Sequence, residues 1–411
     1  MKIQKFFRKV SWFFLSSLLS SLIGLLSIPI LFTSIGGKPW AALVVAQAIG
    51  TILALIVDLG YSHFAPAQIS LIADDKKYEY YMRSLKRRCT VFFPLISIII
   101  VLELSDFLNL KISGIMVLLS YASQGLSSSW LIVSRGQSYN YFKYITLPRN
   151  IGIIVGTLLC YITKNAIAFA LPLLIGNLIS VSFNMPKLKF SKTRDKANKQ
   201  TNSTDFQLEE KIYVNFLNSL LINSMLQIPL VLISLSFSAV IVEFSLLDKI
   251  IKSFLGLTWP IIAVMQSQDM NGKKTNERIK TSSGDVESFQ LSRARVTIFV
   301  CFACSTLIPM LVPFFIRFIS NSQIIFSFYQ NFLIGILVAV LFFNSTISAV
   351  FLVNPMQTRW LLKLNATFFP VMVCVLTLST VLKSLSLYLT LIFVLYLFSS
   401  LTAVRNLHKK N

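Results

Sequence analysis

Apolar segments of membrane-spanning length follow one another along almost the whole chain. A helix needs about 20 apolar residues to cross a hydrocarbon core about 30 Å thick, and 55% of the 411 residues are hydrophobic, which is more than an ordinary soluble domain contains. The pattern predicts an all-α integral membrane protein with about 12 transmembrane helices. The predicted spans are 10–33, 39–62, 87–106, 112–134, 145–162, 165–186, 212–236, 238–266, 296–316, 326–352, 360–381 and 384–404.

The basic residues alternate between the two sides of these spans. Of the 38 lysines and arginines, 31 lie at the termini or in and beside every second gap, five lie in the opposite gaps, and Lys249 and Lys252 lie inside a span. Cytoplasmic loops carry the excess of positive charge, so both termini and the long gaps are predicted to be cytoplasmic. Attraction to anionic membrane lipids then explains the net charge of +22, and nucleic acid is not predicted as a partner.

The chain also divides into two halves of six spans each. The long basic stretch 187–211 separates them, and Ile28-Pro29 in the first span of one half matches Ile228-Pro229 in the first span of the other. Long basic loops follow the second span of each half, at 63–86 and 267–295. Repeats of this kind occur in transporters that alternate access to a central cavity. We predict two six-helix bundles around such a cavity, 1–199 and 200–411.

Several classes of function find no support in the sequence. The gaps predicted to lie outside the cell are too short for an external catalytic domain, and no G-x-x-x-x-G-K-[ST] phosphate loop occurs. His63 and His408 have no nucleophile or metal ligands near them in the sequence, and Cys301 and Cys304 lack a second pair that would complete a metal site. We therefore predict no enzyme activity, metal or cofactor, and expect an ion gradient or the substrate's own gradient to supply the energy.

Polar side chains inside the spans are expected to face a cavity or another helix, because they are costly in hydrocarbon. The carboxamides of Asn218, Asn223 and Gln227 lie on one half of the circumference of their span, together with Pro229, which predicts a cavity-facing role. Stripes of small polar residues in two other spans are explained by close helix packing as well as by a cavity. These residues are Ser16, Ser20, Ser27 and Ser34 beside Gly24, and Ser120, Ser123, Gln124 and Ser127.

The span 238–266 contains most of the ionisable groups at membrane depth. Asp248 and Lys252 are spaced i, i+4 and can form an ion pair, whereas Lys249 adds a net positive charge. Such groups need water or a partner, so we predict that Lys249 and Lys252 line a cavity for an anionic substrate; a pair that serves only packing is the alternative. Glu243 and Asp248 are candidate ion-coupling residues, and Glu243 is the better one because no basic residue lies three or four positions away.

Further candidates lie near the predicted cytoplasmic surface. Arg135, Lys143 and Arg149 flank the short link between two spans, and the topology alone can explain them. Arg149, however, lies about one turn inside its span after Pro148, and a guanidinium group binds phosphate with two parallel hydrogen bonds. We predict that these three residues capture a phosphorylated substrate at the cytoplasmic mouth. Asp58, at the end of its span, is a third ion-coupling candidate; the alternative is a solvated or a helix-end carboxylate.

Four segments carry a family resemblance, and the order of spans and loop lengths supports it over essentially the whole chain. The segments are Ile28-Pro29 followed by Ser34-Ile35-Gly36, Val57-Asp58-Leu59-Gly60-Tyr61, Gln124 through Arg135-Gly136, and Val242-Glu243-Phe244-Ser245 through Asp248-Lys249-Ile250. The chain resembles the Wzx-type flippases, the O-antigen and capsular repeat-unit branch of the multidrug/oligosaccharidyl-lipid/polysaccharide exporter superfamily. It departs from that family at Ile35 to Trp40, where a leucine-glycine followed by a tyrosine-glycine is common, and this affects the first external turn.

The resemblance implies a specific function. Such proteins move an undecaprenyl-pyrophosphate-linked oligosaccharide from the cytoplasmic to the external leaflet of the bacterial cytoplasmic (inner) membrane, for polymerisation into lipopolysaccharide O-antigen or capsule. A polysaccharide polymerase and a chain-length regulator would be further partners. A cation-coupled small-molecule exporter, a membrane glycosyltransferase or polymerase, and a non-transporting scaffold remain as alternatives. The net positive charge in span 238–266 argues against an exporter of organic cations, and the short external loops argue against a polymerase.

Overall fold

The computed structural model describes residues 2–62, 65, 77–104, 110–135, 137–183, 202–236, 241–256, 355–381 and 385–408, together with isolated positions between 314 and 341. Regular structure in this part of the chain is helical throughout, as the sequence predicts. The predicted span 296–316 lies almost entirely outside the described residues, as do most of 326–352, the end of 238–266 and most of the three long loops. The boundary between the two predicted bundles, at residues 199 and 200, lies there as well.

The helices of the first half follow the predicted spans closely. They are α1 (Lys2–Ile35), α2 (Gly37–Asp58), α4 (Lys77–Leu104), α5 (Lys111–Ala122), the 3-10 helix η1 (Ser123–Leu126), α6 (Ser129–Ser134), α7 (Ser138–Tyr141), the π-helix η2 (Phe142–Thr146), α8 (Leu147–Thr163) and α9 (Ala166–Phe183). The described helices of the second half are α10 (Asn202–Ser236), α11 (Ile241–Gly256), α15 (Pro355–Val381) and α16 (Leu385–His408).

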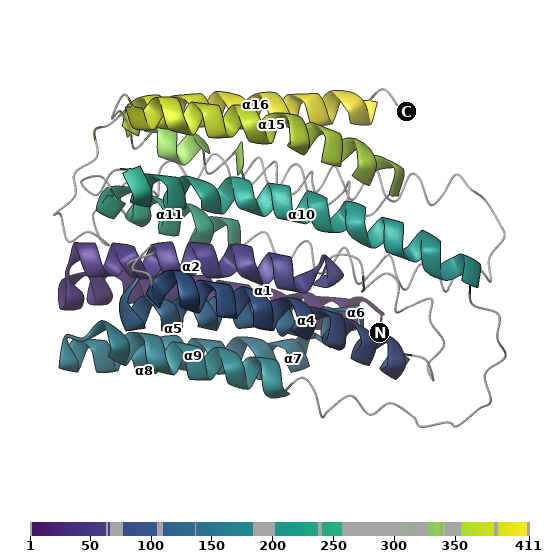
Figure 1. Ribbon diagram of the computed structural model, residues 1–411, viewed down its shortest axis with the longest axis horizontal. Coiled ribbons are helices and arrows are strands. Elements are labelled where there is room, and N and C mark those ends of the chain that lie inside the picture. Colours follow the sequence, from purple (N-terminus) through teal and green to yellow (C-terminus); the bar gives the residue numbers. More distant parts are fainter. Residues whose placement is uncertain are drawn as a thin grey trace.

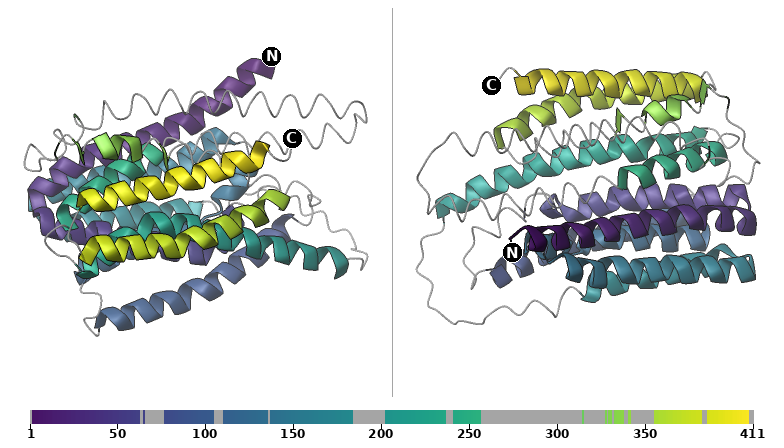
Figure 2. Two further views of the ribbon diagram at one scale, coloured as in Figure 1. Left: turned by 90° about the horizontal axis from the view of Figure 1, so that it is seen from above. Right: turned by 180° about the vertical axis from the view of Figure 1, so that it is seen from behind.

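The two halves lie side by side with their helices roughly parallel (Figure 1). Helices α1 to α9 form one side of the molecule, α15 and α16 lie at the opposite edge, and α10 and α11 lie between. Contacts between the halves run from α10 and α11 to α2 and from α11 to α1. The start of α1 and the end of α16 lie at the same end of the molecule in every view (Figure 2).

Prolines mark the first long helix of each half. Pro29 lies inside α1 and Pro229 inside α10, and both helices are unusually long, with 34 and 35 residues. Each is followed by a shorter helix, α2 or α11, that packs against the other half. The described residues thus show the same order of helices at the start of both halves.

The predicted span 112–134 is one crossing built from three pieces. Helix α5 ends at Ala122, η1 follows, and an extended residue, Ser127 (φ −62°, ψ 138°), precedes α6. Gly125 lies against α2 so closely that a Cβ atom there would be 2.5 Å from the backbone oxygen of Ala54. The break leaves backbone carbonyls without helical partners. The buried guanidinium group of Arg88, on α4, donates hydrogen bonds to the carbonyl oxygens of Gly125 and Ser127. Periodicity cannot reveal such a break, because the hydrophobic pattern continues through it.

Helices α8 and α9 pack through glycines. A Cβ atom on Gly152 would lie 2.6 Å from the carbonyl oxygen of Pro172, and one on Gly156 would lie 2.6 Å from that of Phe169. Small residues let membrane helices approach this closely. The polar stripe of α5 and η1 faces the same α9 helix: Asn177 donates a hydrogen bond to the Ser120 hydroxyl. This stripe therefore serves packing, one of the two explanations that the sequence allows.

The surface and the hydropathy of the helices fit a multi-pass membrane protein. Four helices in the described part of the chain are long and apolar enough to cross a membrane: Trp12–Ile35, Gly37–Asp58, Ser138–Thr163 and Phe216–Ser234. Large apolar side chains point outward, with Phe93, Ile162 and Phe398 each more than 60% exposed. Water would disfavour such a surface, whereas lipid chains would cover it.

Candidate functional site

A cavity of about 470 Å³ lies between the two halves. Its walls come from α1, α2, α5, α7, η2, α8 and α9 of the first half and from α11 of the second. The volume is within the range of small-molecule sites, about 300–1,000 Å³. Among the described residues that line it, the charged ones are Arg149, Lys249 and Lys252, and none carries a carboxylate. Three of the residues predicted to bind an anion therefore meet in one cavity.

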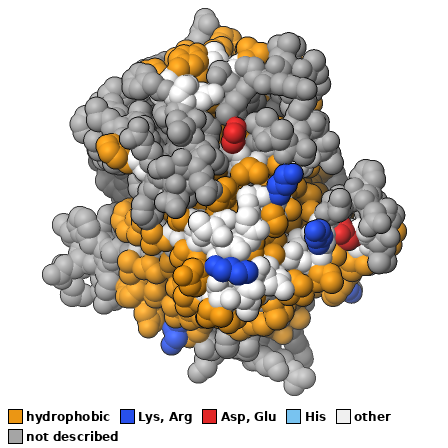
Figure 3. All heavy atoms as spheres, turned by 90° about the vertical axis from the view of Figure 1, so that its left-hand side faces the viewer, with side chains coloured by type: hydrophobic (Ala, Val, Ile, Leu, Met, Phe, Trp, Pro, Cys, Tyr) orange, Lys and Arg blue, Asp and Glu red, His pale blue; other side chains and the backbone are white. Residues whose placement is uncertain are grey.

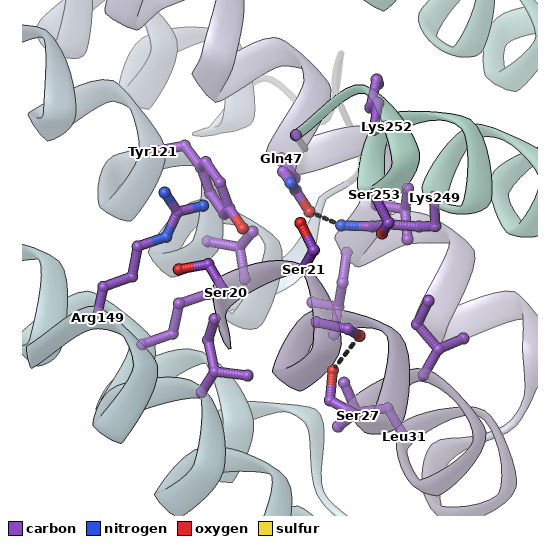
Figure 4. A pocket seen from close by; sticks show the side chains of 18 of the residues that line it. Ser20, Ser21, Ser27, Leu31, Gln47, Tyr121, Arg149, Lys249, Lys252 and Ser253 are labelled. Carbon is purple, nitrogen blue, oxygen red and sulfur yellow. Dashed lines mark hydrogen bonds between the residues drawn. The ribbon is translucent and has the colours of Figure 1, made fainter. Parts of the chain in front are cut away.

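Arg149 and Lys249 approach the cavity from opposite halves, as Figure 4 shows. The guanidinium group of Arg149, on α8, lies over the ring of Tyr121 with its central carbon 5.5 Å from the ring centre. The Nε atom of Arg149 is buried without a hydrogen-bond partner among the described residues. The charges of Lys252 and Arg149 repel the Lys249 ammonium group, and that of Asp248 attracts it. Like charges gathered in this way favour a bound anion.

The ammonium group of Lys249 donates a hydrogen bond to the side-chain oxygen of Gln47 (Figure 4). Gln47 lies on α2, so this bond joins the two halves across the cavity. A second bond between the halves lies nearby, where the Ser17 hydroxyl donates to the carbonyl oxygen of Gly256 at the end of α11.

Lys252 has a different environment from Lys249. Its ammonium group lies 2.6 Å from Asp248 Oδ2 and 2.6 Å from Gln227 Oε1, and both partners belong to the second half. Asp248 is buried and Gln227 is buried. The predicted i, i+4 ion pair is therefore present, and the amide of α10 completes it.

Three of the four serines in the predicted stripe of α1, Ser16, Ser20 and Ser27, line the cavity, and Ser34 does not. Ser17 and Ser21 of the same helix line it as well. Ser20 also donates a hydrogen bond of 3.1 Å to the side-chain oxygen of Asn150. Hydroxyl groups are donors and acceptors at once, so this wall can bind polyhydroxylated groups without adding charge.

A π-helix precedes Arg149. The segment Phe142–Thr146 has π-helical hydrogen bonding, and α8 follows with Pro148 in its first turn. Single π-helical turns inside helices occur often at functional sites. Ile145 and Thr146 of this segment line the cavity together with Arg149.

Other predicted site residues lie away from the cavity lining. Arg135 and Lys143 are exposed, and the Lys143 ammonium lies over the Tyr144 ring. Asn218 accepts a hydrogen bond of 2.5 Å from Asn365 of α15 in the interior of the second half. Asn223 bonds within its own helix to Ser219. Of the three carboxamides, only Gln227 contacts a cavity-lining charge.

The two remaining ion-coupling candidates lie at the ends of helices. Glu243 is in the first turn of α11 and its side chain is exposed. Asp58 is 7% exposed at the end of α2, where its carboxylate accepts hydrogen bonds of 2.9 Å from the backbone N–H and the hydroxyl of Ser62. This carboxylate also attracts the nearby guanidinium group of Arg88. Asp58 is thus a buried helix-end carboxylate rather than a solvated one.

Sequence reasoning missed Gln47 and Arg88. Gln47 is an amide in the middle of an otherwise apolar span, and this is the signal that could have identified it. Arg88 belongs to a run of basic residues that topology already explains, so its complete burial has no signal in the sequence.

The end of the molecule at which α1 joins α2 has few charged side chains in its described part (Figure 3). Hydrophobic side chains surround a central polar area there, with a few lysine or arginine and a few acidic side chains on the same face. Few charges are expected at the end that the positive-inside rule places outside the cell.

Comparisons with known proteins show the fold. No family model matches the chain, and no curated protein matches its sequence. Solved structures of membrane transporters match over nearly the full length of both chains. One is the outward-facing conformation of a multidrug resistance MATE family transporter of the MOP superfamily, with a TM-score of 0.63, 12% identity, and 96% of this chain and 93% of that chain covered. The inward-facing conformation of such a transporter matches with a TM-score of 0.58 and 13% identity, covering 93% and 92%.

A third match has a bound compound. The crystal structure of MATE in complex with MaL6 aligns with a TM-score of 0.63 and 14% identity, covering 98% of this chain and 97% of that chain. The structural alignments show the fold, and identities this low show nothing about the substrate. The structural neighbours of this chain are thus MATE family transporters of the MOP superfamily, solved both outward-facing and inward-facing, and the chain has the fold of a multi-pass membrane transporter.

Proposed function

We propose that this protein is a flippase that moves an undecaprenyl-pyrophosphate-linked oligosaccharide from the cytoplasmic to the external leaflet by alternating access, for surface polysaccharide synthesis. The observation that carries the proposal is the charge of the cavity. Arg149, Lys249 and Lys252 line it, and no carboxylate lines it among the described residues. A pyrophosphate diester is an anion with oxygens on two phosphorus atoms, and it suits guanidinium and ammonium donors.

The other parts of the substrate also find matching surfaces. The serine hydroxyls of α1 offer hydrogen bonds to sugar hydroxyls on one wall of the cavity. The apolar outer surface of the helices would remain in contact with the polyprenyl chain, which stays in the bilayer. The protein then only has to shield the pyrophosphate and the sugars during the crossing, because these are the groups that hydrocarbon rejects.

A cation-coupled small-molecule exporter is the second candidate. Structures with this fold are described as multidrug resistance transporters, and the fold suits both functions equally. The charge of the cavity distinguishes them. An exporter of organic cations needs an uncompensated carboxylate or aromatic rings at its binding site. Aromatic rings do line the cavity, from Trp40, Tyr121, Tyr141 and Phe169. Its three cations would nevertheless repel such a substrate, and the carboxylate of Asp248 is already paired with Lys252.

Flipping in proteoliposomes tests the proposal. Purified protein is reconstituted with a fluorescent undecaprenyl-pyrophosphate-linked oligosaccharide, and the fraction that reaches the far leaflet is measured with a membrane-impermeant quencher. We expect flipping with the native protein and its loss in a double variant, Arg149→Gln with Lys249→Gln. The matched control is Lys164→Gln, which removes an exposed charge outside the cavity lining.

Transport of an organic cation in the same vesicles would instead support the exporter. Proteoliposomes that neither flip the lipid nor move the cation would favour a non-transporting scaffold. Elongation of the oligosaccharide in the vesicles would show a polymerase. In the proposed function the protein hands its substrate to a polymerase and a chain-length regulator, which are its expected partners in the bacterial inner membrane.

A further inference from the structure

The three cations of the cavity do not have equivalent partners. Lys252 contacts a carboxylate, Lys249 contacts a neutral amide, and the Nε of Arg149 has no hydrogen-bond partner among the described residues. Both lysines belong to α11 and each bonds to a glutamine side chain, Gln47 or Gln227. The two lysine–glutamine pairs are therefore chemically alike, and what distinguishes them is the carboxylate and the half to which the glutamine belongs.

The charge of Lys252 is neutralised within the second half. Asp248 lies one helical turn before it, with Oδ2 at 2.6 Å, and the Asp248 side chain is only 9% exposed. Replacing this carboxylate by a substrate phosphate would leave a buried, unpaired charge, which is costly. An incoming anion therefore gains little at Lys252.

The charge of Lys249 is not neutralised by its direct partner. The Gln47 amide oxygen satisfies one of the three N–H donors of the ammonium group without supplying a negative charge. A phosphate oxygen in the same position makes a charge-assisted hydrogen bond, which is roughly twice as strong as one to a neutral acceptor. Exchange of Gln47 for a phosphate oxygen is therefore favourable at Lys249.

We propose that Gln47 holds the place of a substrate phosphoryl oxygen on Lys249, and that Lys249 and Arg149 form the anion-binding pair while Lys252 has a structural role. This inference rests on the proposed function, which it extends by assigning the phosphate contact to particular residues. Because Arg149 and Lys249 belong to opposite halves, the bound anion would replace the direct bond from α2 to α11 by a bridge from α8 to α11.

Binding of inorganic pyrophosphate tests the assignment. Two substitutions of Gln47 are expected to change the affinity for pyrophosphate in opposite directions. Affinity is measured by isothermal titration of the full-length protein in detergent. Gln47→Leu frees the ammonium group, so we expect the affinity to rise roughly two- to tenfold. Gln47→Glu places a carboxylate on Lys249 and should lower the affinity on the order of tenfold, as Lys249→Gln does.

The matched control uses the second pair. Gln227→Leu and Gln227→Glu alter the partner of Lys252 in the same two ways, and we expect both to leave pyrophosphate affinity unchanged because Asp248 already neutralises that lysine. If both positions respond alike, or if Gln47→Leu weakens binding, the assignment is overturned. Two substitutions with opposite expected effects at one position exclude simple misfolding as an explanation.

The outcome separates this inference from the proposed function. The expected affinity order together with absent lipid flipping would retain the phosphate site and refute the flippase. Normal flipping together with an unchanged affinity in the Lys249→Gln protein would retain the flippase and refute the role of Lys249.

Discussion

The side chain of Arg88 offers a direct test of how the first half is held together. It is 0% exposed, and its guanidinium group donates hydrogen bonds to the carbonyl oxygens of Ser127 at 2.8 Å and Gly125 at 3.2 Å, and to that of Ser84 at 3.3 Å. Two of these carbonyls belong to the break between α5 and α6. The ring of Tyr61 lies against the same group, 5.6 Å from the guanidinium carbon.

Replacement of Arg88 by leucine removes these donors and leaves the break uncompensated. Each buried carbonyl without a partner costs about 1–3 kcal/mol, and the relief from desolvating a guanidinium group offsets part of that. For the two carbonyls of the break we expect a net loss of about 3 kcal/mol and a Tm lower by roughly 5 °C. Thermal unfolding of the purified protein in detergent measures it.

The neighbouring Arg87 provides the control. It belongs to the same basic run and is exposed, so Arg87→Leu removes an equal charge from the predicted cytoplasmic side. We expect its Tm to stay close to that of the native protein. Equal effects of the two substitutions would show that Arg88 acts only through topology, and the role of its hydrogen bonds would be refuted.

Three further predictions concern glycines and a carboxylate. Gly152→Ala should lower the Tm because the new Cβ would lie 2.6 Å from a backbone oxygen of α9. Gly24→Ala should leave the Tm unchanged because no atom lies within 4 Å of its Cβ, and equal Tm values would contradict the close α8–α9 packing. Gly60 and Gly36 both have positive φ, but of the two only Gly60 lies against α10 of the other half. Alanine should therefore impair flipping more at Gly60 than at Gly36, and equal impairment would mean that backbone strain alone matters. If Glu243 couples transport to an ion, Glu243→Gln should abolish the response of flipping to an imposed pH gradient, and a normal response would exclude it.

The periodicity of the sequence predicts the helices well because hydrocarbon imposes one length and one polarity on every span. Helices α2, α8 and α9 begin and end within a few residues of their predicted spans. Extensions beyond the spans escape this rule: α4 begins at Lys77 and α10 at Asn202, each ten residues before its predicted span and on the predicted cytoplasmic side. Water does not require these segments to end where the membrane does.

The site could be predicted only in part. Depth and spacing identified Lys249, Lys252 and the Asp248 pair, because charges at membrane depth must find water or partners. Which part of the amide-bearing side of α10 meets the cavity was not accessible, since only tertiary packing directs Asn218 inward to Asn365. The different partners of the two lysines depend on α2 and α10, which are distant in sequence.

A structure of the protein bound to its substrate tests the central claim most directly. Cryo-electron microscopy of the full-length protein in a lipid nanodisc, with undecaprenyl-pyrophosphate-linked oligosaccharide added, would locate the pyrophosphate. We expect phosphate oxygens within about 3 Å of both Arg149 and Lys249, the Gln47 side chain released from Lys249, and Lys252 still paired with Asp248. Pyrophosphate bound elsewhere, or an organic cation held in this cavity, would contradict the account.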